Sequence, residues 1–356
     1  VHDLSLGNPV LEPPEPFFEA LRELGASRGE GHHRYMPNAG FPQVRERVAE
    51  WVRRAGILDA RSEGVVMTVG AGGAISIALK ALVDPGDEVL CLAPYFVEYL
   101  FYAEHCGGVP VVVETDARCE LDVAAIEARL GPRTKVVMVN TPNNPTGRVY
   151  SAASLRSLTD CLRRAEARLG RSIYLISDEP YRPIVYEGTA PNFLNDYDNS
   201  LLIYSWSKAL SIPGDRIGFV AASPRCADRR VADALIFANR TLGFVNAPAT
   251  MQLAVLRLLD VPPPVETYRR LRDRTVEGLR RAGYDFVVPE GAVYVFPRSP
   301  IPDDVAFAQG ALQERVIVVP GTGFGRAGHF RISFAVEEAA LDGGLAALAL
   351  ARAKLA

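Results

Sequence analysis

Short apolar runs alternate with longer amphipathic stretches over the first two-thirds of the chain, and this alternation constrains the fold most. Runs with the apolar, β-branched character of strands cover residues 64–69, 88–92, 109–113, 135–140, 172–177, 201–204 and 218–222. Helical patterns separate several of them, at residues 73–82, 96–106, 123–130 and 152–169. Strands buried on both faces and separated by helices are typical of a mainly parallel sheet between two helical layers. The sequence therefore predicts an α/β domain.

The pattern changes after Pro248. Helical patterns at 249–259 and 265–281 are separated by a run of three prolines, Pro262 to Pro264. Short strand-like pieces follow near 293–296, 316–319 and 330–334, and an Ala/Leu-rich helical pattern runs to the end. We therefore expect a large α/β domain over residues 35–248 and a smaller α+β domain built from residues 1–34 and 249–356.

Charge and composition disfavour several classes of partner. The chain has 39 Lys and Arg against 42 Asp and Glu, a net charge of −3, with no long basic run, so nucleic acid is not an expected partner. Its apolar runs are far shorter than the roughly 20 residues of a membrane-spanning helix, so no membrane span is expected. The five cysteines form no C-x-x-C pair, which indicates reduced thiols and a cytoplasmic protein. The histidines lack ligand spacing, and no metal site is expected.

Three polar segments each follow a predicted strand. They cover residues 143–147, 177–181 and 205–208 and carry Asn144, Asp178, Tyr181 and Lys208. Because the carboxyl ends of parallel strands meet at one edge of a sheet, where such folds bind ligands, these side chains should converge. Each has a simpler explanation when taken alone: Asp178 as a helix cap, Asn144 as part of a proline-linked turn, Lys208 as a surface charge.

An amine, a carboxylate, a phenol and an amide together fit the chemistry of pyridoxal 5′-phosphate. An amine forms an imine with the aldehyde of this cofactor, and a carboxylate keeps the pyridine nitrogen protonated so that the ring accepts electrons. The ordered set resembles the class I and II aminotransferases, which have the aspartate aminotransferase fold, and the resemblance covers essentially the whole chain.

The resemblance implies roles for the three polar segments. Lys208 corresponds to the lysine that forms the Schiff base and then acts as general acid and base, and Asp178 to the partner of the pyridinium nitrogen. Tyr181 and Asn144 correspond to the residues that hydrogen-bond the phenolic oxygen of the cofactor and stabilise its ionised form.

The resemblance also implies a phosphate site. A glycine-rich turn between a predicted strand and helix lets backbone N–H groups approach an anion. The residues that correspond to the family's phosphate site are Ala71, Gly72, Gly73, Ser205, Ser207 and Arg216. Many members carry hydroxyl or polar side chains in the turn, whereas this chain has alanine and glycine there. Only main-chain contacts are therefore expected from the turn.

Four further residues match family positions. Phe96 corresponds to the aromatic ring stacked on the cofactor, which would contribute about 0.5–1.5 kcal/mol, although a core role is also possible for it. Tyr35 corresponds to a tyrosine that reaches the phosphate of the neighbouring subunit, which implies a homodimer with shared active sites. Arg331 corresponds to the arginine that binds the substrate α-carboxylate. Gly7 corresponds to the glycine of the family's N-terminal segment, whose backbone closes over the substrate.

The resemblance implies transfer of an amino group between an L-amino acid and a 2-oxo acid. The same machinery supports other carbanion chemistry, including C–S β-lyase, cyclase and oxidase reactions, and these alternatives stay open. Arg240 is out of register with the family's cation for a distal carboxylate, which disfavours strict aspartate specificity. A non-catalytic sensor of the cofactor is a distant alternative. A nucleotide-binding protein without the cofactor would leave Asp178, Tyr181 and Lys208 unexplained.

Overall fold

The computed structural model describes residues 1–27 and 31–355. Its helices are α1 (Glu15–Ala26), α2 (Pro42–Arg54), α3 (Gly70–Leu82), α4 (Glu98–His105), α5 (Val123–Arg129), α6 (Ala152–Leu169), α7 (Val231–Thr241), α8 (Ala249–Leu256), α9 (Val265–Arg281), α10 (Asp304–Gln313) and α11 (Glu338–Leu355). Its strands are β1 (His2–Asp3), β2 (Val65–Thr68), β3 (Glu88–Ala93), β4 (Val109–Glu114), β5 (Thr134–Asn140), β6 (Tyr174–Asp178), β7 (Ser200–Ser205), β8 (Gly218–Ala222), β9 (Tyr294–Val295), β10 (Val316–Ile317), β11 (Val319–Pro320) and β12 (Phe330–Ser333).

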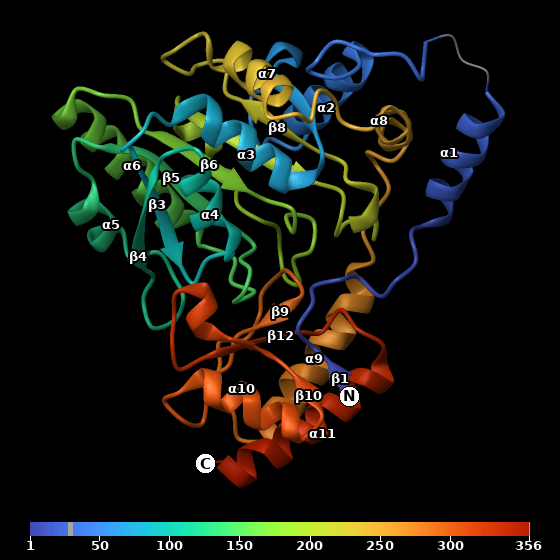
Figure 1. Cartoon of the computed structure of the whole chain (residues 1–356), viewed down its shortest axis with the longest axis vertical. Helices are drawn as coiled ribbons and strands as arrows, with labels where there is room; N and C mark the ends of the chain where they lie inside the picture. The colour runs from blue at the N-terminus through green and yellow to red at the C-terminus, as the bar shows by residue number, and fades with distance from the viewer. Residues whose placement is uncertain (28–30, 356) are drawn as a thin grey trace.

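The central sheet has seven strands in the order β2-β8-β7-β6-β5-β3-β4 (Figure 1). Strand β8 runs antiparallel to both of its neighbours, and the remaining pairs are parallel. Asn140 pairs with Asp178, and Asp178 pairs with Ile203 on the next strand. The carboxyl ends of β5, β6 and β7 therefore lie side by side, and the expected mainly parallel sheet is confirmed.

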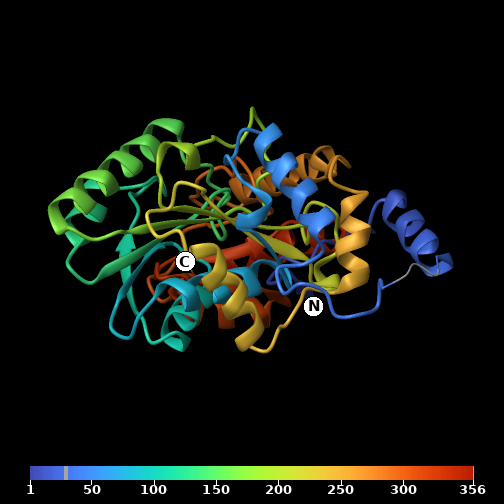
Figure 2. The same ribbon diagram turned by 90° about the horizontal axis from the view of Figure 1, so that it is seen from above.

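Two helical layers cover the sheet, as Figure 2 shows from above. Side chains of α1, α2, α5, α6 and α8 share one apolar core with one face of the sheet. Side chains of α3, α4 and α7 share a second core with the other face. The strands are buried from both sides, which explains why their sequences are continuously apolar rather than alternating. The α/β fold expected from the sequence is confirmed.

Helix α6 shows how local sequence sets these elements. The Ser151 hydroxyl accepts a hydrogen bond from the backbone N–H of Ser154 and caps the first turn. Gly170 ends the helix at φ +65°, a left-handed conformation that glycine adopts without steric cost. Leu155, Leu158 and Leu162 recur at helical spacing and are buried against the sheet.

A smaller unit lies below the sheet in Figure 1. It contains the antiparallel strands β11-β12-β9, the parallel pair β1-β10, and helices α9, α10 and α11, whose side chains share a third core. Strand β1 thus brings the N-terminal segment beside the C-terminal part of the chain.

Two segments that the sequence assigns to the smaller domain pack elsewhere. Phe17 and Ala20 of α1 and Met251 of α8 belong to the core beneath the large sheet. The domain boundaries at residues 34 and 248 stay a prediction, and residues 28–30 of the first segment, with residue 356, lie outside the described residues. Among the helices of the described residues, none combines the length and apolar character needed to cross a membrane.

Candidate active site

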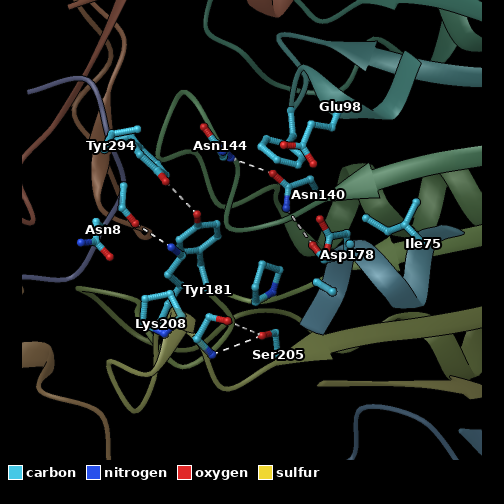
Figure 3. A pocket seen from close by; sticks show the side chains of 18 of the residues that line it. Asn8, Ile75, Glu98, Asn140, Asn144, Asp178, Tyr181, Ser205, Lys208 and Tyr294 are labelled. Atoms are coloured by element: carbon cyan, nitrogen blue, oxygen red, sulfur yellow. Dashed lines mark hydrogen bonds between the residues drawn. The ribbon is translucent and has the colours of Figure 1, made fainter. Parts of the chain in front are cut away.

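A cavity of about 520 Å³ lies at the carboxyl ends of the parallel strands, facing the smaller unit. The predicted site residues that line it are Gly7, Ala71, Gly72, Phe96, Asn144, Asp178, Tyr181, Ser205, Ser207, Lys208, Arg216 and Arg331. Figure 3 shows Asp178, Tyr181, Ser205 and Lys208 converging on it from neighbouring strands. The structure thus brings together residues that are up to 324 positions apart in the sequence, from Gly7 to Arg331 (331 − 7 = 324).

Lys208 follows β7 and is half-buried at the cavity wall. Its Nζ donates a hydrogen bond of 2.6 Å to the carbonyl oxygen of Gly7. Burial, followed by the nearby guanidinium groups of Arg216 and Arg331, lowers the pKa of Lys208 to about 8. The chain has four lysines, at positions 80, 135, 208 and 354, and of these Lys208 lines the cavity.

Asp178 ends β6 and is only 4% exposed. Its Oδ2 accepts a hydrogen bond of 2.5 Å from the Tyr99 hydroxyl, while its buried Oδ1 has no partner among the described residues. Burial raises the pKa of Asp178 to about 7; the hydrogen bond from Tyr99 acts in the opposite direction, and the nearby Glu179 adds to the rise. Asp178 is therefore held at the cavity with one oxygen open to a donor.

The neighbouring carboxylate has a different environment. Glu179 is fully buried and accepts hydrogen bonds from the Ser177 hydroxyl at 2.6 Å and from Arg182 Nη1 at 2.5 Å. Successive residues at the end of an extended strand point to opposite sides, so Asp178 lines the cavity and Glu179 does not. Glu179 thus has a cationic partner in Arg182, whereas no ion pair with Asp178 is found within residues 1–27 and 31–355.

The glycine turn joins β2 to α3. Gly70 has φ +77°, a conformation that favours glycine, and a Cβ there would lie 2.8 Å from Arg216 Nη2, so a side chain at this position would displace the guanidinium. The N–H groups of Ala71 and Gly72 belong to the first turn of α3, where helical N–H groups lack partners within the helix. With Arg216 alongside, this end of the cavity is suited to an anion.

Two hydroxyl groups extend this anion-binding end. The Ser205 and Ser207 hydroxyls lie 2.8 Å apart, and the N–H of Ser207 donates to Ser205 Oγ at 3.2 Å. Ser205 is the last residue of β7, and Ser207 lies in the turn that follows it, the same turn that carries Lys208. Short polar side chains directly after a strand thus place two further donors at the sheet edge.

Arg331 lies on β12 and is 8% exposed. Its Nη1 donates to Asn144 Oδ1 at 3.0 Å and its Nη2 to the backbone oxygen of Ser5, while its guanidinium lies 4.6 Å from the ring centre of Tyr294 and 4.8 Å from that of Phe324. Within residues 1–27 and 31–355 it has no acidic partner. A buried, positioned guanidinium without a counter-ion is suited to bind a carboxylate bidentately.

Tyr181 and Gly7 meet at Tyr294. The Tyr181 and Tyr294 hydroxyls are 2.9 Å apart, as the dashed line in Figure 3 shows. A Cβ at Gly7 would lie 1.7 Å from the Tyr294 hydroxyl oxygen, so only glycine permits the N-terminal segment to cross the cavity here. Asn144 is anchored through its backbone N–H, which donates to Asn140 Oδ1 at 2.7 Å.

Three predicted residues need separate mention. Phe96 lines the cavity and packs edge-to-face on Tyr99, with ring centres 5.6 Å apart. Gly73 lies outside the cavity lining, and a Cβ there would meet the Val69 side chain at 2.7 Å, so its absent side chain serves close packing. Tyr35 is 92% exposed and lines a separate groove with residues 244–247, away from the cavity of its own chain.

Several residues of the site were not assigned from the sequence, Tyr99 and Tyr294 among them. The Tyr99 hydroxyl is the hydrogen-bond partner of Asp178. Tyr294 was not identified at all, because it lies on a two-residue strand without a motif. The described residues contain no cluster of three or more His, Cys, Asp or Glu side chains that would hold a metal ion.

Comparisons with known proteins agree with this geometry. The family described as "Aminotransferase class I and II" matches residues 1–348. The "Probable aspartate/prephenate aminotransferase" of Thermus aquaticus is 37% identical over 344 residues, which cover 94% of this chain and 87% of that protein. The aspartate/prephenate aminotransferase of Thermus thermophilus is 37% identical over 350 residues, covering 94% and 86%.

Solved structures give the same result. The crystal structure of an amino transferase from Eubacterium rectale superposes with a TM-score of 0.94 at 34% identity, covering 99% of this chain and 89% of that one. Aspartate aminotransferase from Thermus thermophilus with maleate superposes with a TM-score of 0.90 at 33% identity, covering 99% and 91%. The match extends over the sheet, the smaller unit and the cavity between them, and the chain belongs to the class I and II aminotransferases, enzymes that transfer amino groups.

Proposed function

We propose that this aminotransferase works with pyridoxal 5′-phosphate bound in the cavity and moves an amino group between an L-amino acid and a 2-oxo acid. The observation that carries the proposal is the unpartnered Oδ1 of Asp178, a buried acceptor that faces the same cavity as the Lys208 amine. A protonated ring nitrogen would supply the missing donor and the missing positive charge.

The other groups of the cavity fit the same cofactor. The turn at Ala71 and Gly72, the Ser205 and Ser207 hydroxyls and Arg216 form an anion-binding end suited to a phosphate. Phe96 offers an aromatic ring for stacking, and the Tyr181 and Asn144 side chains offer polar groups for a phenolic oxygen. Gly73 is proposed to support the turn through packing rather than through contact.

The reaction divides between the cofactor and the chain. When bound, pyridoxal 5′-phosphate supplies an aldehyde that captures the substrate amino group and a ring that accepts electrons from the Cα–H bond. Lys208 would hold the aldehyde of the bound cofactor, and its Nζ, once displaced by the substrate amino group, would act as the base that removes the Cα proton and as the acid that returns a proton. Because its pKa is lowered to about 8, roughly one-tenth of the amine is neutral at pH 7, far more than for a lysine with the ordinary pKa of 10.5, and proton removal requires this neutral form.

Three side chains and one backbone carbonyl support this step. Asp178 holds the charge on the ring nitrogen, with Tyr99 fixing the carboxylate. Arg331 binds and orients the substrate α-carboxylate through its guanidinium fork. The Gly7 carbonyl, now the acceptor of the Lys208 hydrogen bond, belongs to the segment that covers the cavity and excludes water.

A homodimer with shared active sites is part of this proposal. Tyr35 is exposed and does not line the cavity of its own chain, which fits a role at the phosphate of a partner subunit. If so, an inactive Lys208→Ala chain mixed with an inactive Tyr35→Ala chain should form hybrid dimers with one intact site and regain activity. No regained activity after subunit exchange would contradict shared sites.

A cytoplasmic location stays a prediction, and the five thiols are unpaired.

The amino-acid half-reaction tests the proposal. Protein loaded with pyridoxal 5′-phosphate is mixed with single amino acids, and the visible absorbance of the bound aldehyde form is followed. Transamination predicts loss of that band, formation of the amine form and release of the matching 2-oxo acid, without ammonia. Release of ammonia and pyruvate without the amine form would favour the lyase alternative. Aspartate is the first amino acid to test, because the curated relatives are named for it.

A further inference from the structure

The glycine turn has no polar side chain of its own, but two polar groups reach it from elsewhere. Arg216 Nη2 occupies the space beside Gly70, where a Cβ would lie 2.8 Å from it. The Tyr102 hydroxyl occupies the space beside Gly72, where a Cβ would lie 2.9 Å from the phenolic oxygen. Each glycine therefore leaves room for the end of a side chain that comes from another element.

Tyr102 faces the cavity from helix α4. It lines the same cavity as Ala71, Gly72 and Arg216, and it is half-buried. Its hydroxyl donates a hydrogen bond to Glu98, one turn earlier on the helix. The carboxylate that accepts this bond belongs to an exposed residue, so water can solvate it if the phenol turns to another acceptor. In Figure 3, Glu98 lies on the side of the cavity opposite Lys208 and Ser205.

The protonation state of Tyr102 suits a donor. Burial, followed by the hydrogen bond to Glu98, raises the pKa of Tyr102 well above its usual range, and Arg216 acts in the opposite direction. The phenol therefore keeps its proton at neutral pH. Arg216 lowers the pKa of Tyr102 because its guanidinium lies near the Tyr102 side chain. A neutral O–H beside a guanidinium and free helical N–H groups is a further donor for an anion at this end.

We propose that the Tyr102 hydroxyl donates a hydrogen bond to the phosphate of the bound cofactor and supplies the side-chain hydroxyl that the glycine turn lacks. On binding, the phenol exchanges the Glu98 carboxylate for a phosphate oxygen. Gly72 is then required because any side chain there would displace the Tyr102 hydroxyl. This inference rests on the proposed function, since it assumes that pyridoxal 5′-phosphate is the ligand.

Equilibrium titration of cofactor-free protein separates a phosphate contact from general damage. Pyridoxal 5′-phosphate and pyridoxal, which lacks the phosphate, are titrated against wild type and Tyr102→Phe. On binding, a phosphate oxygen replaces the Glu98 carboxylate as the acceptor of the Tyr102 hydrogen bond. The net gain in affinity is therefore smaller than that of a whole charge-assisted hydrogen bond, and Tyr102→Phe should lower the affinity for pyridoxal 5′-phosphate about 5- to 20-fold. Pyridoxal should bind both proteins equally. The matched control is Tyr174→Phe, which removes a hydroxyl at the far end of β6 and should change neither constant.

A second variant tests the geometry. Gly72→Ser in wild type places a side chain against Tyr102 and should weaken binding of the phosphorylated ligand. In the Tyr102→Phe background the same serine has room and returns a hydroxyl to the turn, so it should recover most of the lost affinity. Additive losses in the double variant would contradict the proposal.

The outcomes distinguish the inference from the function it rests on. If wild type binds pyridoxal 5′-phosphate and Tyr102→Phe binds it equally well, or if Tyr102→Phe loses both ligands to the same extent, the inference is wrong and the proposed function stands. If wild type binds neither ligand, the proposed function fails and the inference fails with it.

Discussion

Replacing Asp178 by asparagine is expected to stabilise the cofactor-free protein by an amount that depends on pH. The carboxyl is buried, one of its oxygens has no partner, and no cation neutralises it. Its pKa is raised from an ordinary value of 3.8 to about 7 in the folded chain. The folded protein therefore binds this proton more tightly than the unfolded chain does, and wild-type stability must fall as pH rises from about 4 to about 7.

The size of the effect follows from the same values. The difference between 7 and 3.8 is about three pH units, which at ~1.4 kcal/mol per unit amounts to about 4 kcal/mol once the carboxyl is ionised in both states. Asparagine avoids this penalty but leaves a buried amide incompletely paired, at a cost of ~1–3 kcal/mol. Asp178→Asn should therefore gain about 1–3 kcal/mol at pH 8 and lose this advantage near pH 4.

Urea unfolding of the cofactor-free proteins, followed by circular dichroism at fixed protein concentration between pH 4 and pH 8, measures this difference. The control is Asp84→Asn, which makes the same substitution at an exposed aspartate outside the cavity. A stability difference between Asp178→Asn and wild type that is the same at pH 5 and pH 8 would refute the reasoning. So would an asparagine variant that is less stable at pH 8.

Three further predictions concern the same cavity. Tyr99→Phe removes the hydrogen bond that lowers the pKa of Asp178, so the fall of stability with pH should extend above pH 7 in the same urea experiment; an unchanged profile would contradict this. Arg331→Gln should raise the KM for amino and 2-oxo acids about 10- to 100-fold in steady-state kinetics and leave cofactor affinity within twofold. A loss of cofactor affinity as large as the rise in KM would indicate a structural role for Arg331. In the proposed mechanism the neutral amine of Lys208 reacts with the cofactor aldehyde, so the rate of cofactor association should rise with pH to a plateau with its midpoint near pH 8. A flat rate from pH 6.5 to 9.5 would contradict the lowered pKa.

The raised pKa of Asp178 also predicts how cofactor binding changes stability. A buried charge that only a bound ligand neutralises lowers the stability of the cofactor-free protein, and ligand binding restores that stability. Cofactor binding should therefore stabilise the wild type more than it stabilises Asp178→Asn.

Much of the fold was predictable because each strand of the central sheet is a continuous apolar run. The predicted strand at 135–140 corresponds to β5 (Thr134–Asn140), and the predicted helix at 152–169 to α6. Helix α10 was not predicted, because the run Asp304–Gln313 has a weak apolar pattern and is held by packing. Helix α1 was not predicted to join the large core, because nothing local shows that Phe17 will meet α8.

The site was predictable where residues follow strands in sequence order. Asp178 ends β6, and Asn144 and Lys208 follow β5 and β7; the register of a parallel sheet brings such positions together. Tyr99 could not be assigned in this way, because its partnership with Asp178 depends on how α4 packs across the sheet edge. Tyr294 meets Gly7 only through the fold of the smaller unit, which no local pattern encodes.

The central claim is that the amine of Lys208 is the group that holds the cofactor, and one measurement tests it most directly. Protein loaded with pyridoxal 5′-phosphate is reduced with borohydride, digested and mapped by mass spectrometry. With four lysines in the chain, every candidate can be assigned. We predict stoichiometric modification of the peptide that contains Lys208. Modification at Lys80, Lys135 or Lys354 instead, or no modification of protein that has taken up the cofactor, would contradict the account.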